Sequence, residues 1–263
     1  MNLLLPSLGL CALLVALPAQ AAPEDPLAKG TENHEAQVLG WSADGKRFVV
    51  RLYQLDPFTP RPALGEKPLC PGYVSHEGNA FQGGLVWLVY ERSRLISALP
   101  ILDVKTCTPE QEAQKRTEAA KKKLGSLGIQ LDAPGREILA HVNTSSIDVS
   151  QGAQAPYTLE YEERATPQAS KAPSEMQRGA LEQQLYVRKG EARQRVLGRK
   201  SSFEYSTAMA GYLRTGLDRV WLSPSGSTVV VLAYERVGNM SGGRKSLRLL
   251  GVLGWSGAAL KPL

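Results

Sequence analysis

The chain has 263 residues, of which 43% are hydrophobic, and 31 basic against 25 acidic residues give a formal net charge of +6. This length is enough to bury a sizeable core, as one large domain or as two small ones. Because acidic residues are interleaved with the basic ones, we expect an ordinary solvated surface and no nucleic-acid partner; weak attraction to anionic polymers or lipid headgroups stays open.

Residues 1–21 have the pattern of a secretory signal peptide. An apolar run over residues 3–17 precedes the sequence P-A-Q-A-A, an A-x-A site that predicts cleavage after Ala21. The run is too short and wrongly flanked for a membrane span. No Lys or Arg precedes it, so an uncleaved anchor, or lipid attachment at Cys11, stays as an alternative. We expect a periplasmic or secreted protein without a transmembrane helix in the mature chain.

Cleavage at that site leaves two cysteines, Cys70 and Cys107. An even pair in an exported chain predicts a disulfide. Closing a loop of about 37 residues is expected to stabilise the fold by about 3–4 kcal/mol. Two lone cysteines without C-x-x-C spacing make a poor redox or metal site, so we expect the pair to be structural.

The first predicted strands follow a lead-in. Residues 22–35 contain Pro, Glu and Gly without periodicity, and we expect them to be flexible. Strands are predicted at 36–41 and 46–55. Both faces of the second strand are largely apolar, with Phe48, Val50 and Leu52 on one face and Val49, Arg51 and Tyr53 on the other. Such a strand is typical of a layered or propeller-like sheet, where both faces are covered.

Residues 56–71 hold five prolines, which exclude a central strand and predict a long surface loop tethered by Cys70. Two further strands are predicted after it, at 85–91 and 97–104. Each is short and mostly apolar, and the pair is expected to form a hairpin.

One α-helix is predicted at about 108–125. Thr108 is expected to cap its N-terminus, and Pro109 is expected to occupy the first turn, where its missing N–H costs nothing. Gly125 or Gly128 is expected to end it. Its apolar stripe is thin, so one face is expected to rest on a sheet while the rest is solvated.

The remainder of the chain is predicted to be β-rich. Strands or hairpins are expected at 137–142, 157–164, 181–188, 194–198, 218–236 and 247–255. Residues 166–179 are rich in Pro, Ala, Ser and Lys and are predicted to be a flexible excursion; residues 201–211 are ambiguous. We therefore expect residues 36–263 to form a single domain, mainly β, of antiparallel sheets with propeller-like or sandwich-like packing and one α-helix.

Two segments near the ends of this domain share one pattern. The first reads W-S-A-D-G-K at 41–46, and the second reads W-L-S-P-S-G-S at 221–227. In each, a short strand leads through Ser into a four-residue turn that Gly closes before a long β-rich strand. Gly at the closing position suits a turn that needs a positive φ. We expect two hairpins with the same turn.

No catalytic, cofactor-binding or metal site is recognisable. His34, His76 and His141 lack metal-ligand spacing, and nucleophile motifs are absent. Scattered acidic residues could meet only in the fold; they are Asp56, Asp103, Asp148 and Asp218. The four tryptophans sit in or beside apolar strands and are interpreted as core anchors rather than as a stacking platform for a ligand; they are Trp41, Trp87, Trp221 and Trp255.

The turn at 41–46 and its echo at 222–226 resemble the hairpins of TolB-like β-propeller blades, in which a W-S-P-D-G-type turn joins two strands. The order of features also resembles a family of predicted secreted bacterial proteins of unknown function. These share an early G-[FW]-S-x-D-G-[KR] hairpin, a central helix ending in a pattern matched by L-G-I at 127–129, and a late S-P-[SD]-G hairpin. The resemblance spans most of the mature chain. It implies export and a β-rich fold and carries no activity.

These features predict an exported, non-catalytic binding or interaction module. The loops at 56–71 and 166–179 are the expected contact surfaces, with an envelope protein as the expected partner. The alternative is a cell-envelope hydrolase whose acidic residues converge only in the fold. The partner and the oligomeric state stay open.

Overall fold

The computed structural model describes residues 24–29, 31–32, 34–56, 73–76, 79–103, 108–139, 145–151, 154–167, 176–206, 212–238, 244–256 and 259–263. Several predictions fall outside these ranges: the signal peptide at 1–21, most of the loop at 56–71, both cysteines of the predicted disulfide (Cys70 and Cys107), and His141. They stay predictions.

The protein is mainly β, as predicted, and its described residues form three antiparallel sheets and two helices. The N-terminal sheet contains β2 (His34–Ser42), β3 (Arg47–Asp56), β4 (Tyr73–His76), β5 (Asn79–Glu91), β6 (Arg94–Leu102) and β7 (Ile129–Gln130). The C-terminal sheet contains β1 (Thr31–Glu32), β8 (Arg136–Leu139), β13 (Tyr212–Leu222), β14 (Thr228–Gly238), β15 (Arg244–Ser256) and β16 (Ala259–Pro262). The outer sheet contains β9 (Ser146–Gln151), β10 (Gln154–Pro167), β11 (Met176–Lys189) and β12 (Ala192–Ser206). The helices are α1 (Pro26–Lys29) and α2 (Glu110–Ser126).

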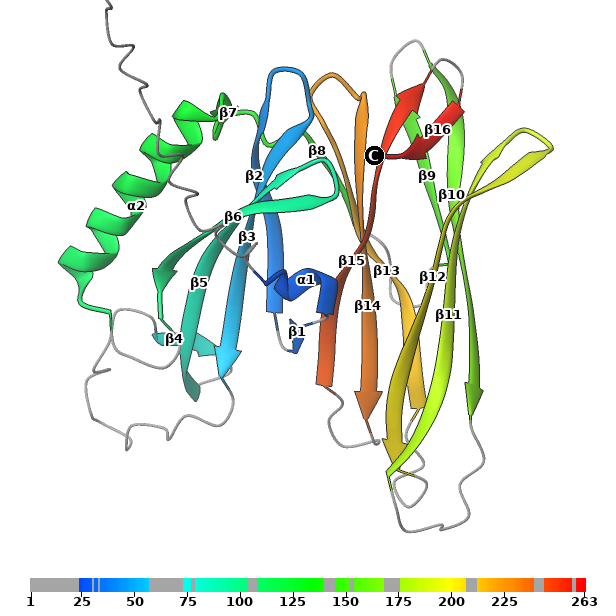
Figure 1. Ribbon diagram of the computed structural model, residues 1–263, viewed down its shortest axis with the longest axis horizontal. Helices are drawn as coiled ribbons and strands as arrows, with labels where there is room; N and C mark the ends of the chain where they lie inside the picture. The colour runs from blue at the N-terminus through cyan, green and yellow to red at the C-terminus, as the bar shows by residue number, and fades with distance from the viewer. Residues whose placement is uncertain are drawn as a thin grey trace, which may run out of the picture.

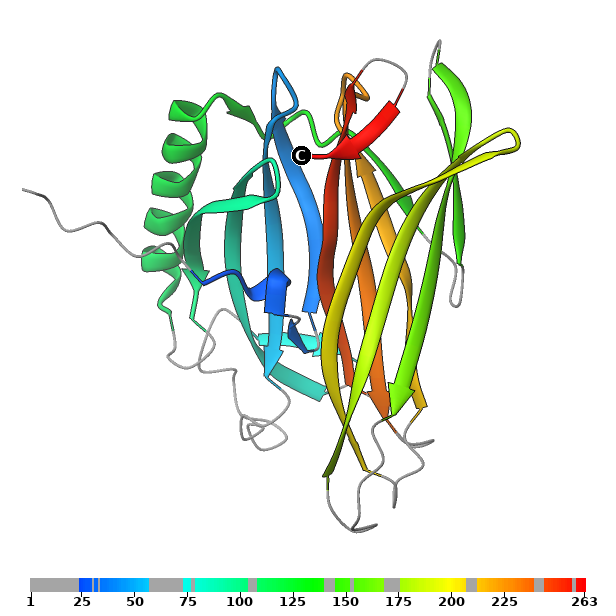
Figure 2. The same cartoon turned by 45° about the vertical axis from the view of Figure 1, so that its right-hand side comes forward.

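These elements pack as four layers in a row: α2, the N-terminal sheet, the C-terminal sheet and the outer sheet (Figures 1 and 2). A hydrophobic cluster fills each of the three interfaces between layers. The cluster between the two six-stranded sheets includes Trp41, Phe48, Leu88, Tyr90, Trp221 and Val230. Since both faces of these two sheets are covered, their central strands are apolar on both faces.

The alternation of side chains along β3 and β14 shows how the sequence builds this stack. In β3, Val49 packs in the cluster with α2, whereas Phe48 and Val50 pack against the C-terminal sheet. In β14, Val230 packs against the N-terminal sheet and Val231 against the outer sheet. All five side chains are fully buried, and burying each contributes about 1.5–3 kcal/mol. The prediction of strands covered on both faces is confirmed.

The two six-stranded sheets follow the same strand plan. The N-terminal sheet has the order β6-β5-β3-β2-β7, with β4 paired to the beginning of β5. The C-terminal sheet has the order β16-β15-β14-β13-β8, with β1 paired near the beginning of β15. Each sheet is therefore a meander. In the N-terminal sheet, β7 pairs with β2, the first strand of the first predicted hairpin. In the C-terminal sheet, β8 pairs with β13, the first strand of the second predicted hairpin.

The turns of the two predicted hairpins define which positions of these sheets correspond. Gly45 N–H donates to the Ser42 carbonyl oxygen at 2.9 Å, and Gly226 N–H donates to the Ser223 carbonyl oxygen at 2.8 Å. Counted from these serines, Phe48 of β3 corresponds to Val229 of β14. Phe48 faces the C-terminal sheet, while Val229 faces the outer sheet, one layer further along.

The two sheets are thus stacked with the same face forward, as neighbouring blades of a propeller are. Among the described residues, however, three sheets form an open row and do not close into a propeller (Figure 1). Helix α2 covers the free face of the N-terminal sheet, so that face needs no further blade to bury its apolar side chains.

Helix α2 lies where a helix was predicted, but Thr108 does not cap it. The capping position is Pro109, which makes no side-chain hydrogen bond to the helix. Thr108 Oγ1 instead accepts the Asp103 N–H at 3.0 Å, in the connection from β6. At the other end the prediction holds: Gly128, with φ 72°, follows the last turn, and its N–H donates to the Gly125 carbonyl oxygen at 3.0 Å.

The described part of the lead-in, which was expected to be flexible, forms α1 and β1. The Leu27 side chain is fully buried in the cluster between the two six-stranded sheets. Asp25 Oδ1 accepts the Leu27 N–H at 2.9 Å and the Tyr90 hydroxyl at 2.8 Å. Burial, together with the Asp25 carboxylate, raises the pKa of the Tyr90 hydroxyl, which therefore stays a donor.

This short segment contacts all three sheets. Asp25 binds Tyr90 of the N-terminal sheet, β1 pairs with β15 of the C-terminal sheet, and Arg199 Nη2 of the outer sheet donates to the Ala28 carbonyl oxygen at 2.6 Å. A four-residue helix is too short for hydrophobic periodicity to reveal, which explains why the sequence did not predict it.

Both flanks of the predicted excursion at 166–179 belong to the outer sheet. Thr166 pairs with Ala180, and Pro167 pairs with Gly179, so β10 and β11 extend into it; residues 168–175 lie outside the described ranges. Strands β9 and β16 were also not predicted. Pairing between β10 and β11 orders the flanks. The composition of the segment shows only that it has few apolar side chains to bury, which is why it was predicted to be flexible.

Candidate functional site

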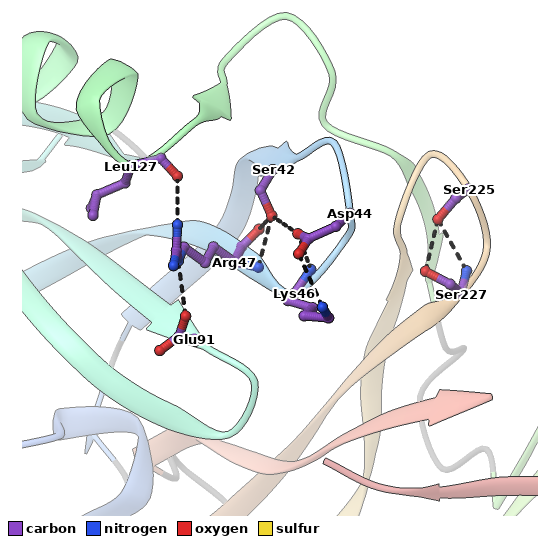
Figure 3. Close-up of polar contacts among 8 residues, drawn as sticks. All are labelled: Ser42, Asp44, Lys46, Arg47, Glu91, Leu127, Ser225 and Ser227. Carbon is purple, nitrogen blue, oxygen red and sulfur yellow. Dashed lines mark hydrogen bonds and ion pairs between the residues drawn. The ribbon is translucent and has the colours of Figure 1, made fainter. Parts of the chain in front are cut away.

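The first turn (residues 42–47) joins β2 to β3 and is held by Ser42. Arg47 N–H donates to Ser42 Oγ at 2.9 Å, and this hydroxyl donates to Asp44 Oδ1 at 2.7 Å. The same Asp44 oxygen accepts the Lys46 N–H at 3.0 Å (Figure 3). Gly45 closes the turn with a φ of 69°, as the sequence predicted. The side chains of the turn therefore satisfy the Lys46 and Arg47 N–H groups locally.

The second turn (residues 223–228) joins β13 to β14 with the same framework. Thr228 N–H donates to Ser223 Oγ at 3.1 Å, and Gly226 has a φ of 69°. Ser225 stands where the first turn has an aspartate: its Oγ lies 3.2 Å from Ser223 Oγ and accepts the Ser227 N–H at 3.3 Å. This turn carries no charged side chain.

The two turns lie side by side at one edge of the stack (Figures 1 and 3). A Cβ atom built on Gly45 would lie 3.0 Å from Ser227 Oγ and 3.2 Å from Ser223 Cβ. A side chain at position 45 would therefore press on the second turn, which would have to shift by a few tenths of an ångström. The first turn, which carries the charged side chains, lies next to the hairpin that joins β5 to β6.

An open polar pocket of about 520 Å³ lies at this edge, and we call it the turn-edge pocket. Its lining comes from the first turn, from the β5–β6 hairpin and from the residue after β16. The lining residues are Asp44, Lys46, Arg47, Glu91, Arg92, Ser93, Arg94 and Leu263. Four of these are basic and two are acidic, so the pocket carries a positive surplus.

Hydrogen bonds tie the three segments of the pocket together. Arg92 N–H donates to the Lys46 carbonyl oxygen at 2.7 Å, which joins the two hairpins. Ser93 Oγ donates to the Leu263 carbonyl oxygen at 2.6 Å, which joins the β5–β6 hairpin to the C-terminal sheet. These bonds fix the backbones of the three segments relative to one another before any ligand arrives.

Arg47 connects the floor of the pocket to α2. Its Nε donates to Glu91 Oε1 at 2.9 Å, and its Nη1 donates to the Leu127 carbonyl oxygen at 3.2 Å (Figure 3). A cation at the C-terminus of a helix is favoured by the unpaired carbonyl groups there. Arg47 therefore ties the first turn to α2, and it forms an ion pair with the carboxylate of Glu91.

Arg92 and Arg94 are exposed cations of the pocket. Arg92 has a φ of 55°, the one positive φ at a non-glycine residue among the described ranges. A left-handed backbone costs such a residue on the order of 1–3 kcal/mol and is found mostly where function or packing requires it. Glu91, directly across the strand pair from Arg94, is bound by Arg47. No ion pair of Arg92 or Arg94 is formed with the part of the chain that is described.

Asp44, the second acidic side chain of the pocket, also has hydrogen-bond partners. Hydrogen bonds from the Ser42 hydroxyl and the Lys46 N–H lower the pKa of Asp44 to about 2. Lys46 Nζ lies 3.4 Å from Asp44 Oδ2 in an exposed pair, which contributes little to stability. At neutral pH the pocket thus combines two carboxylates that are paired with Lys46 and Arg47 and two arginines that have no acidic partner among the described residues.

The residues that the sequence singled out for chemistry do not meet at this pocket. His34 begins β2, and His76 ends β4 opposite Asn79. The four acidic residues are distributed over all three sheets and their connections: Asp56 ends β3, Asp103 follows β6, Asp148 lies in β9 and Asp218 lies in β13. Asp148 accepts the Thr158 hydroxyl and Asp218 accepts Arg219 Nε. Asp148 and Asp218 therefore belong to different sheets and have separate partners.

The tryptophans occupy the core, as predicted. Trp41 and Trp221 are 1% exposed and Trp87 is 7% exposed, while Trp255 is half-buried against Tyr157. Trp41 Nε1 also donates to the Pro134 carbonyl oxygen at 2.9 Å, which anchors the connection between β7 and β8. None of the four lines the turn-edge pocket.

Sequence reasoning missed Arg92 and Arg94. The only signal was local: a two-residue turn, R-S, between two apolar strands, with arginine where a positive φ favours Gly or Asn. The pocket itself could not be found from the sequence because its three segments are about 45 and 170 residues apart.

Within the described ranges, no group of three or more His, Cys, Asp or Glu side chains could hold a metal ion. No helix in the described part of the chain is long and apolar enough to cross a membrane. Comparisons with protein-family models, with curated proteins and with solved structures gave no match to this chain.

Proposed function

We propose that the protein is an exported, non-catalytic binding module that holds a partner in the periplasm or outside the cell through the turn-edge pocket. The observation that carries this proposal is the pocket itself: three distant segments, joined by one backbone hydrogen bond and one from the Ser93 hydroxyl, present two arginines that form no ion pair with the described residues. Such an arrangement suits recognition of a negatively charged group on the partner. Export rests on the predicted signal peptide.

Preorganisation supports a binding role for this edge. The Arg92 backbone is held in a costly conformation by its hydrogen bond to Lys46, and Ser93 is bound to the residue after β16. A surface that is already ordered loses less conformational entropy when a partner binds. The same rigidity makes the edge a more selective contact surface than a free loop of equal charge.

The hydrolase alternative is less well supported. Its simplest form needs one carboxyl group that keeps a proton near neutral pH and donates it to the leaving group. Asp44, one of the two carboxylates of the pocket, has a pKa of about 2 and cannot serve as that acid. The other, Glu91, is bound by Arg47. No observation favours this alternative over binding.

The test is an affinity capture from the envelope extract of the source cell, with the tagged mature chain at low and at moderate salt. We expect one partner at both salts for the wild type and a loss of most of it for Arg92→Gln/Arg94→Gln. The matched control is Lys115→Gln/Lys122→Gln, which removes two exposed charges from α2 and should capture normally.

Three results would count against the proposal. If the Arg92→Gln/Arg94→Gln variant captured as much partner as the wild type, the pocket would not be part of the contact surface. Capture only at low salt, lost equally in both double variants, would indicate non-specific attraction to the net positive charge. Turnover of a glycan or ester substrate that Glu91→Gln abolishes would favour the hydrolase.

A further inference from the structure

We infer that the turn-edge pocket takes a doubly charged tetrahedral oxyanion, that is, a phosphate group, bound between the guanidinium groups of Arg92 and Arg94 with Lys46 beside them. The inference deepens the proposed function and rests on the same site, since it names the chemical group that the partner would present there. The inference follows from the positive charges of Arg92 and Arg94 and from the hydrogen-bond donors of their guanidinium groups.

The first step concerns charge. Of the four cations that line the pocket, Arg47 is paired with Glu91, and Lys46 lies 3.4 Å from Asp44. Counted over the side chains that line the pocket, the two remaining cations, Arg92 and Arg94, leave a surplus of two positive charges. One carboxylate would neutralise half of this surplus, whereas one phosphate monoester, with a charge of about −1.5 to −2 at pH 7, would neutralise nearly all of it.

The second step concerns donors. Each guanidinium carries five N–H groups in a planar fork, and a fork can engage two oxygen atoms at once. Two forks and one ammonium supply more donors than a single carboxylate can accept, but they match the three free oxygen atoms of a phosphate monoester. The pocket, about 520 Å³ and open to solvent, has room for such a group on a larger molecule.

The third step concerns placement. Arg92 is the first residue of the two-residue turn and Arg94 directly follows the turn, and repulsion between them would be relieved by moving one arginine elsewhere or by pairing it with an acid. The cross-strand acid is present, but Arg47 holds it. Arg92 further keeps a left-handed backbone that glycine would adopt at lower cost. An anion bound by both side chains explains why arginine occupies this position.

The experiment is a titration of the isotopically labelled mature protein with inorganic phosphate, followed by amide chemical shifts at constant ionic strength. Sulfate and acetate serve as a second dianion and as a carboxylate. We expect saturable shifts at 44–47 and 91–94, with phosphate and sulfate binding about tenfold more tightly than acetate. Arg92→Gln/Arg94→Gln should weaken phosphate binding about tenfold or more, and Lys115→Gln/Lys122→Gln should leave it unchanged.

A second arm distinguishes the source of the phosphate. Neutral phosphatidylcholine vesicles doped with phosphatidic acid present a phosphomonoester on a membrane, and those doped with phosphatidylglycerol present a phosphodiester. Binding to the phosphatidic acid vesicles that the arginine variant abolishes points to a lipid headgroup. Binding of free phosphate without vesicle binding points to a soluble or polymer-borne phosphate. Either result supports the inference.

The inference is overturned if acetate binds as well as phosphate, or if the arginine variant binds phosphate like the wild type. Far-ultraviolet circular dichroism and thermal melting show that each variant is folded; an unfolded variant is replaced by Arg94→Gln alone. The two proposals can fail separately. Partner capture through the pocket without phosphate binding leaves the proposed function standing, and phosphate binding without any partner leaves only the anion site.

Discussion

The first and second turns have the same backbone and different surfaces. In both, a serine hydroxyl accepts the N–H five residues later, and a glycine with φ 69° closes the turn. Asp44 and Lys46 of the first turn correspond to Ser225 and Ser227 of the second. The first turn lines a charged pocket, while the second packs against the first.

This comparison separates two kinds of requirement on a short segment. The positions that set the turn, Ser and Gly, are the same in both copies because the hydrogen bonds and the positive φ demand them. The positions that point outward are free to differ, and in the first turn they carry the charges. We expect substitutions at the shared positions to act on stability and those at the differing positions to act on binding.

The largest effect is expected where the turns touch. Gly45→Ala should lower the free energy of unfolding by about 2–3 kcal/mol, since it adds the cost of a left-handed alanine to a close contact with Ser223 and Ser227. Gly190→Ala is the matched control, because Gly190 has a φ of 59° with nothing within 4 Å; it should cost about 1 kcal/mol. Urea unfolding measures the loss of stability in both variants. Equal losses would show that contact with the second turn adds nothing to the cost of an alanine at position 45.

The shared serines should differ because one is more deeply buried. Ser223→Ala leaves the buried Thr228 N–H without its acceptor and should cost about 1–3 kcal/mol. Ser42→Ala frees the partly buried Arg47 N–H, which water can reach, and should cost about 0.5–1.5 kcal/mol. Chemical denaturation of the two variants tests the order. A larger loss for Ser42→Ala would mean that the Asp44 network, rather than burial, decides the stability of a turn.

The smallest effect is expected from making the first turn like the second. The folded state holds the pKa of Asp44 at about 2, below its ordinary value of 3.8, so its carboxylate stabilises the fold above that ordinary value. This contribution should fall as the pH drops from about 5 to about 2. Because the group is exposed, we expect only a few tenths of a kcal/mol.

Asp44→Ser therefore should be slightly less stable than the wild type at pH 6, and the two should converge at pH 2. Unfolding curves across this range give the difference directly. Ser225→Asp is the reciprocal control and should introduce a similar dependence on pH into the second turn. A difference between wild type and Asp44→Ser that persists unchanged at pH 2 would contradict the assignment of the effect to this carboxylate.

Local features of the fold could be predicted with good accuracy from the sequence. The alternation in β3 predicted a strand covered on both faces, which Phe48 and Val49 confirm by packing into different interfaces. The closing glycines of both turns and the position of α2 were also predicted correctly, and of the two glycines expected to end α2, Gly128 does so while Gly125 lies within the helix. In these cases the decisive interactions join residues within a few positions of each other.

Predictions failed where contacts in the folded chain outweighed the local pattern. Thr108 has the character of a helix cap, but the connection from β6 uses its hydroxyl. The lead-in looks featureless, but Leu27 finds a buried site between two sheets that are formed by distant residues. The flanks of the excursion at 166–179 are polar and proline-containing, but strand pairing orders them.

The sequence by itself therefore determined the two turns, the two-faced strands and the helix, because these depend on residue type at short spacing. Only the tertiary structure decided that the two six-stranded sheets stack in an open row with the same face forward. It also decided that Arg92 and Arg94 line a pocket with Lys46 and Leu263. Those features depend on contacts between segments far apart in the chain, whose geometry no local pattern encodes.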